Sequence, residues 1–189
     1  MSNKYALLIG NGDYDDPKLP NLKTPVHDAT ALQALLQNPE VGGFDDVRTL
    51  RNATQQQMRV AIGELFTRKH KPDDMLLFYF SGHGELDNDS NLYLVAKDTR
   101  RGAMLPVTGV DAGFVSRLMN NARSRRQVII LDSCYSGAFG TGAKGGRVGT
   151  KNIFEGNGYG RYVLTASDAL QLSWEGDRII EGEVINSFF

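Results

Sequence analysis

Two side chains that can carry out covalent chemistry lie in short glycine-containing motifs, 51 positions apart. His83 belongs to the motif SGHG at residues 81–84, and Cys134 belongs to the motif DSCYSG at residues 132–137. A thiolate is a strong nucleophile, and a neighbouring imidazole can generate it and later protonate a leaving amine. The two residue types together predict nucleophilic catalysis by a thiol.

Each motif directly follows a short apolar run, Met75–Phe80 before the histidine and Gln127–Leu131 before the cysteine. If these runs are neighbouring parallel strands, their ends lie about 4.8 Å apart at one edge of a sheet. A single cysteine or histidine alone is more often a packing or loop residue, but this shared placement favours catalysis. The backbone N–H groups of Gly84 and Cys134 could then form an oxyanion hole.

The elements that would position these motifs follow from the hydrophobic pattern. Continuously apolar runs such as MLLFYF and VIIL are typical of strands covered on both faces. Between these runs, apolar residues recur at helical intervals. Asp28 is a candidate cap of the first helix, Thr54 and Gln57 form a capping box before the second, and the third is expected from Asp111 to Ala122. The sequence predicts an α/β layered fold. The expected strands are Tyr5–Ile9, Asp46–Leu50, Met75–Phe80, Gln127–Leu131 and Arg161–Thr165.

Composition limits the function classes. The chain has 189 residues, 41% of them hydrophobic, which suits one domain, and its net charge of −1 argues against nucleic-acid binding. Its single cysteine excludes an internal disulfide and suits a reducing compartment. The N-terminus is not typical of a signal peptide, and no apolar run approaches the length of a membrane span. We therefore expect a cytoplasmic protein that binds neither membrane nor nucleic acid.

The segment Ser136–Gly160 is too rich in glycine for a packed element, and a loop of that length is usually functional or mobile. It would link a larger region, 1–137, to the start of a smaller one, 161–189, within one domain. The chain ends at Asn186–Phe189 in what resembles the start of a further apolar element. We therefore expect a fragment of a longer protein, with a remaining C-terminal segment.

The paired motifs SGHG and DSCYSG, each after an apolar strand, resemble the caspase-fold cysteine peptidases, and most closely metacaspases and their prokaryotic relatives. The separation of the histidine and the cysteine also suits caspases. The opening segment YALLIGN resembles the first strand of the family. The resemblance implies a three-layer fold with a six-stranded, mostly parallel sheet, of which five strands are visible, a Cys–His dyad, and hydrolysis of peptide bonds.

The resemblance also implies a specificity. Caspases carry Ser-Trp-Arg where this chain has Ser-Trp-Glu at 173–175, so the charge there is reversed. In metacaspases, aspartates matching Asp28 and Asp132 line a pocket for Arg or Lys, and Ser81 would lie nearby. A bound guanidinium relieves the repulsion between two such carboxylates. Asp28 could equally be a helix cap, and Trp174 could be either a wall of the cleft or a core residue.

Further expectations concern self-cleavage, calcium and the remaining histidines. In caspase-like enzymes the linker after the cysteine is a common site of self-cleavage, and here it contains Lys144, Arg147 and Lys151. Many metacaspases bind calcium, but only Asp98 and Asp111 remain at the expected places, which is a poor site. We therefore expect no cofactor, and partners that are peptides or proteins with Arg or Lys before the scissile bond, together with a candidate regulatory partner. The alternative is a catalytically silent caspase-like binding module. His27 and His70 are expected at the surface.

Overall fold

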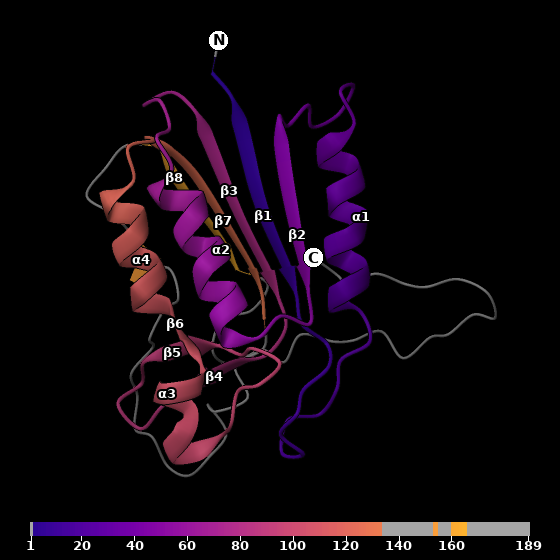
Figure 1. Cartoon of the computed structure of the whole chain (residues 1–189), viewed down its shortest axis with the longest axis vertical. Coiled ribbons are helices and arrows are strands. Elements are labelled where there is room, and N and C mark those ends of the chain that lie inside the picture. Colours follow the sequence, from indigo (N-terminus) through magenta and orange to yellow (C-terminus); the bar gives the residue numbers. More distant parts are fainter. Residues whose placement is uncertain (1, 134–152, 155–159, 166–189) are drawn as a thin grey trace, which may run out of the picture.

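The computed structural model describes residues 2–133, 153–154 and 160–165. Five parallel strands form one sheet in the order β2-β1-β3-β7-β8 (Figure 1). Each of the five predicted strands is confirmed to within one residue at either end. Their bounds are β1 Lys4–Gly10, β2 Asp46–Arg51, β3 Met75–Ser81, β7 Arg126–Asp132 and β8 Arg161–Thr165.

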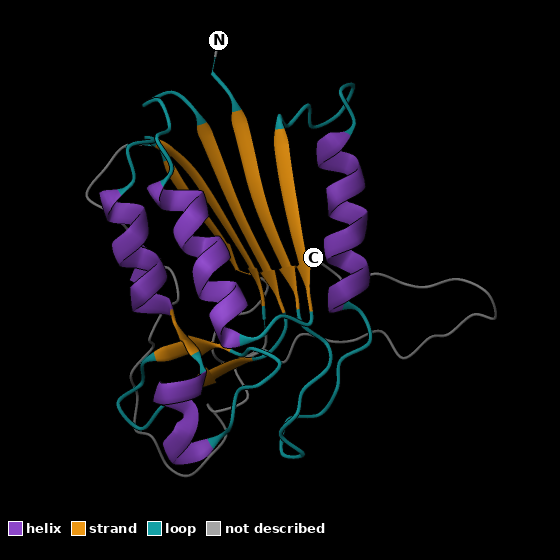
Figure 2. Ribbon diagram, viewed as in Figure 1, coloured by secondary structure: helices purple, strands orange, loops and turns teal. Residues whose placement is uncertain are grey.

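Helices cover both faces of this sheet, as Figure 2 shows. The helix α1, Pro25–Gln37, packs on one face, where Leu77 and Tyr79 belong to its apolar cluster. The helices α2, Gln55–Thr67, and α4, Ala112–Asn121, pack on the other face, which receives Phe78. Because successive residues of β3 alternate between two buried faces, its sequence is apolar from Met75 to Phe80.

The helix starts follow their capping residues, with one exception. Thr54 and Gln57 form the predicted capping box of α2, and Asp111 caps α4 by accepting the Gly113 N–H at 2.7 Å. The prediction that Asp28 caps α1 is wrong. That helix begins three residues earlier, at Pro25, whose fixed φ suits the first helical position.

The sequence did not indicate a second, three-stranded antiparallel sheet at the carboxyl ends of the main strands. Its strands have only two or three residues, too few for a hydrophobic period to be recognised. They are β4 Gly84–Leu86, β5 Leu92–Leu94 and β6 Val110–Asp111, and two short helices lie between the last two, η1 Gly102–Met104 and α3 Leu105–Thr108. No helix in the described part of the chain has the length and apolar character needed to cross a bilayer.

Candidate active site

The SGHG motif and the start of the DSCYSG motif leave the sheet side by side. Ser81 and Asp132 are register partners at the ends of β3 and β7. The Gly82 N–H then donates to the Asp132 carbonyl at 3.2 Å, so the two segments stay joined beyond the strands. His83 and Cys134 each follow this pair by two positions. Cys134 itself lies outside the described residues.

The His83 ring is fixed through one of its nitrogens. Its Nε2 lies 2.8 Å from the carbonyl oxygen of Pro20, and the residue is 7% exposed. Because a carbonyl oxygen can only accept, Nε2 carries the hydrogen in this contact. In the neutral imidazole Nδ1 is then the proton acceptor, and a proton acceptor is what a thiol nucleophile requires.

Tyr14 holds the histidine backbone from the loop that follows β1. Its hydroxyl accepts the His83 N–H at 3.0 Å and donates to the Asn11 carbonyl at 2.6 Å. Its ring lies 4.9 Å from the His83 ring, centroid to centroid. Asn11 is fully buried, and its side-chain amide bonds the backbones of Ala53 and Val95, at 2.8 and 3.1 Å. The loop is thereby tied to both sheets.

The two glycines of SGHG have different uses. Gly82 adopts a φ of +152°, and a Cβ there would lie 3.0 Å from both the Asn11 carbonyl oxygen and the Tyr14 hydroxyl. Gly84 pairs with Leu94 in a ladder where the Val95 N–H donates to the His83 carbonyl. Gly84 is therefore at a non-hydrogen-bonded position, and its N–H points away from β5. That direction suits a donor to a substrate oxygen.

The two candidate pocket aspartates act on one tyrosine of β3. Burial raises the pKa of Tyr79, and the carboxylates of Asp132 and Asp28 raise that pKa further, while a hydrogen bond with Ser81 lowers it. Asp28 is 8% exposed, Asp132 7% and Ser81 2%. Two largely buried carboxylates therefore lie near enough to Tyr79 to oppose its ionisation, on the α1 side of the sheet, where a cation would offset their charge.

The remaining predicted site residues are not in the described part of the chain. Trp174 and the candidate cleavage sites Lys144, Arg147 and Lys151 lie outside the described residues, as Cys134 does. Of the predicted site residues, the structure therefore places Ser81 and Asp132 beside the segment that carries His83 and Gly84, and Asp28 and Asp132 both act on Tyr79.

The two aspartates weighed as calcium ligands already have structural partners. Asp98 accepts the Gln55 N–H at 2.7 Å at the start of α2, and Asp111 caps α4 and pairs with Arg117 at 3.4 Å. Among the described residues, no three or more His, Cys, Asp or Glu side chains are grouped to hold a metal ion.

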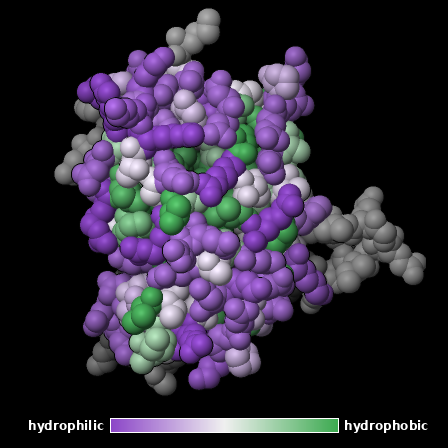
Figure 3. Space-filling model, viewed as in Figure 1, coloured by the Kyte–Doolittle hydropathy of each residue, from purple (hydrophilic) through white to green (hydrophobic). Residues whose placement is uncertain are grey.

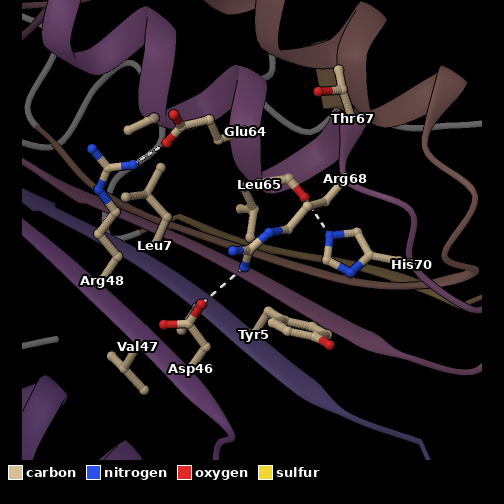
Figure 4. A pocket seen from close by; sticks show the side chains of 12 residues that line it. Tyr5, Leu7, Asp46, Val47, Arg48, Glu64, Leu65, Thr67, Arg68 and His70 are labelled. Carbon is tan, nitrogen blue, oxygen red and sulfur yellow. Dashed lines mark hydrogen bonds and ion pairs between the residues drawn. The ribbon is translucent and has the colours of Figure 1, made fainter.

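A separate cavity of about 570 Å³ lies between α2 and the first residues of β1 and β2, at the opposite end of the sheet from His83 (Figure 4). Figure 3 shows this face as mostly hydrophilic, with a hollow that has hydrophobic atoms inside. His70 lines the cavity. The prediction that it is a surface residue is wrong, because its Nε2 bonds the Leu65 carbonyl at 2.7 Å and its ring packs on Tyr5. His27 is exposed, as expected.

Four residues near His83 were not identified from the sequence: Tyr14, Pro20, Glu85 and Arg101. Pro20 acts through its backbone carbonyl, which leaves no signature in residue type. Glu85 did offer a signal, since it is an acidic residue two positions after the histidine. Its partner Arg101 lies 16 residues away and could not be assigned to it by spacing.

Comparison with known proteins supports the family resemblance that the two motifs suggested. A family model described as "Caspase domain", of peptidase family C14, matches residues 3–178. Among solved structures, the chain is similar to a protein of Geobacter sulfurreducens, with a TM-score of 0.56 and 23% sequence identity over 71% of this chain and 52% of that one. The chain thus spans about half the length of that protein, and the likeness concerns the fold. Among curated protein sequences, none matches significantly.

Proposed function

Because the chain belongs to the caspase-domain family of peptidases, we propose that it is a cysteine endopeptidase in which Cys134 is the nucleophile and His83 its base. One observation carries this proposal. His83 and Cys134 each follow the register pair Ser81–Asp132 by two residues, and the His83 ring is hydrogen-bonded through Nε2, which leaves Nδ1 as the proton acceptor. A thiol two residues beyond Asp132 would be within reach of that nitrogen.

The proposed reaction has two stages. His83 takes the thiol proton, and the Cys134 thiolate attacks the scissile carbonyl carbon to give a tetrahedral oxyanion. The N–H groups of Gly84 and Cys134 donate to that oxygen. The C–N bond breaks as His83 returns its proton to the leaving amine, and a thioester remains. His83 then takes a proton from water, whose oxygen attacks the thioester and releases the acid and the free thiol.

The proposed specificity is for Arg or Lys before the scissile bond, in peptide or protein substrates. Its support is the pair of largely buried carboxylates of Asp28 and Asp132 around Tyr79 and Ser81. A substrate guanidinium would neutralise both and could form paired hydrogen bonds with one of them. Trp174 is the candidate for an apolar wall beside this pocket.

We also propose that the enzyme works without calcium, since Asp98 and Asp111 serve as helix-terminal hydrogen-bond acceptors. Processing in the linker after Lys144, Arg147 or Lys151 is a further proposal. We further propose that the enzyme acts in the cytoplasm, which suits its single cysteine. A regulatory partner or a C-terminal segment would modulate it.

The test is covalent labelling by a peptidyl inhibitor with a thiol-directed group. An Arg-containing inhibitor should add one equivalent of mass to the wild-type protein and none to Cys134→Ala, with or without a calcium chelator. The matched Asp-containing inhibitor should label far more slowly. If neither inhibitor labels the protein, a silent binding module is favoured. Faster labelling by the Asp-containing inhibitor would reject the proposed pocket for Arg or Lys. Loss of labelling when the chelator is added would reject calcium independence.

A further inference from the structure

We propose that Arg101 is a positioning residue for His83: its guanidinium joins the strand that follows the histidine to the loop whose carbonyl holds the histidine ring. This inference rests on the proposed function, since positioning of His83 matters to catalysis only if His83 is the base. The two ends of the link are Glu85, which is two residues after His83, and the loop 11–24, which contains Pro20.

The first half of the link is the ion pair between Arg101 and Glu85. Nη2 of Arg101 lies 3.0 Å from Oε1 and 3.1 Å from Oε2 of Glu85. The Glu85 side chain is only 5% exposed and that of Arg101 32%, so the carboxylate is shielded from water and depends on its partners. Glu85 lies in β4, so the guanidinium acts on the short strand that begins immediately after His83.

The second half is the hold on the loop. The same guanidinium donates through Nη1 to the Lys18 carbonyl at 3.2 Å, and the Arg101 backbone N–H donates to Asp16 Oδ2 at 2.8 Å. The backbone N–H groups of Lys18 and Arg101 hold the pKa of Asp16 below its ordinary value, so this carboxylate is charged at neutral pH. Arg101 thus binds the loop by its side chain and its main chain.

The loop matters because Pro20 is two residues beyond Lys18. Pro20 is exposed, and its carbonyl accepts the hydrogen of His83 Nε2. Other anchors also hold this loop, among them the Tyr14 hydroxyl, which accepts the His83 N–H at 3.0 Å, and the Lys97–Asp15 ion pair at 3.9 Å. Arg101 is the anchor whose side chain connects the loop directly to the strand after His83.

The chemical consequence concerns which ring nitrogen carries the hydrogen. If the Pro20 carbonyl moves away, the preference for a hydrogen on Nε2 weakens and Nδ1 is protonated in part of the neutral population. A molecule in that form cannot accept the thiol proton at Nδ1. Loss of Arg101 should therefore lower kcat while KM changes little, because substrate contacts remain in place.

The test combines nuclear magnetic resonance with kinetics. With only three histidines in the chain, nitrogen-15 chemical shifts of the His83 ring can be measured in a Cys134→Ala background. We expect the Nε2–H form to dominate at high pH, and Arg101→Ala to increase the Nδ1–H form. In the enzyme with Cys134, Arg101→Ala should lower kcat about tenfold or more, since small displacements of catalytic groups are costly. Arg101→Lys, which keeps the charge but not both bonds, should fall between.

The matched control is Arg100→Ala, an exposed neighbour of the same type that has no ion pair among the described residues. It should leave both the ring shifts and kcat unchanged. Unaltered His83 shifts in Arg101→Ala, or in Arg101→Lys if the alanine variant does not fold, would overturn the positioning role. If the wild-type protein cleaves no peptide, the proposed function fails, yet the ring shifts still decide whether Arg101 positions His83.

Discussion

Ser81 and Asp132 face each other at the last positions of the parallel strands β3 and β7, and the next N–H, that of Gly82, bonds the Asp132 carbonyl at 3.2 Å. The chain segments that lead to His83 and Cys134 therefore begin at two neighbouring strand ends that are joined by a backbone hydrogen bond.

Removal of either dyad side chain should abolish peptide hydrolysis. Cys134→Ala removes the nucleophile, and His83→Ala should cost about 10²–10⁴-fold in kcat through loss of the base. The double variant should be hardly worse than the more severe single one, because members of one catalytic unit fail together. Initial rates on an Arg-containing peptide, with circular dichroism to verify the fold, measure this. More than a small percentage of activity in either variant would contradict the dyad.

Asp132→Asn should weaken recognition of a cationic substrate. Loss of a buried charged hydrogen bond costs about 2–5 kcal/mol, which is about 30- to 5000-fold in kcat/KM. The matched control is a substrate with citrulline in place of arginine, which has nearly the same shape without the charge. Wild type should prefer arginine strongly, and Asp132→Asn should lose most of that preference. An equal loss on both substrates would instead indicate a general disturbance of the site.

Gly82→Ala should destabilise the protein and Gly63→Ala should stabilise it. Alanine at position 82 would have to adopt a φ of +152°, which side-chain-bearing residues rarely do, and its Cβ would press on the Asn11 carbonyl and the Tyr14 hydroxyl. We expect a cost of about 1–3 kcal/mol. Gly63 lies within α2 with nothing within 4 Å of the added carbon. Alanine should gain about 0.5–1 kcal/mol there. Urea unfolding of both variants measures the difference, and equal midpoints would refute it.

Much of the fold could be predicted because the strands are buried on both faces. Met75–Ser81 is apolar at nearly every position for that reason, and the residues that follow each strand then had to meet at one edge. The family that the two motifs resemble is confirmed by the family model. The prediction that Asp28 and Asp132 line one pocket came from the resemblance. In the structure, both carboxylates raise the pKa of Tyr79.

The support around His83 could not be predicted for physical reasons. The partner of its ring is a backbone carbonyl, which every residue has, so nothing marks Pro20 in the sequence. The Arg101–Glu85 pair depends on how the loop that carries Arg101 packs against the short strand β4. His70 is buried by a hydrogen bond to a helix-end carbonyl and by a ring contact, neither of which is periodic along the chain.

The Asp74 carboxylate should make stability depend on pH in the acid range. Backbone N–H groups of Asn3 and Lys71 hold its pKa below the ordinary value of about 3.9. A lowered folded-state pKa means that this stabilisation is present above the unfolded-state pKa and is lost as pH falls through the folded-state value. Asp74→Asn should therefore be less stable than wild type at pH 7.

The difference between Asp74→Asn and wild type should narrow as the pH is lowered below about 4. Asp73→Asn is the matched control, because Asp73 is the exposed neighbour of the same type. It should follow wild type at every pH. Urea unfolding midpoints across this range measure all three proteins, and a constant difference between Asp74→Asn and wild type would contradict the assignment.

The last prediction concerns cleavage in the linker that follows the nucleophile. Lys144, Arg147 and Lys151 are residues that the proposed pocket should accept, and they lie among glycines, so the chain there can adopt the extended form that a protease cleft requires. Purified wild type should acquire new termini after one or more of these residues, whereas Cys134→Ala should stay intact. Mass spectrometry of both proteins after incubation measures this. Replacement of all three by glutamine should prevent the cleavage without loss of activity on a short peptide. An intact linker in an enzyme that readily cleaves that peptide would show that processing is not required.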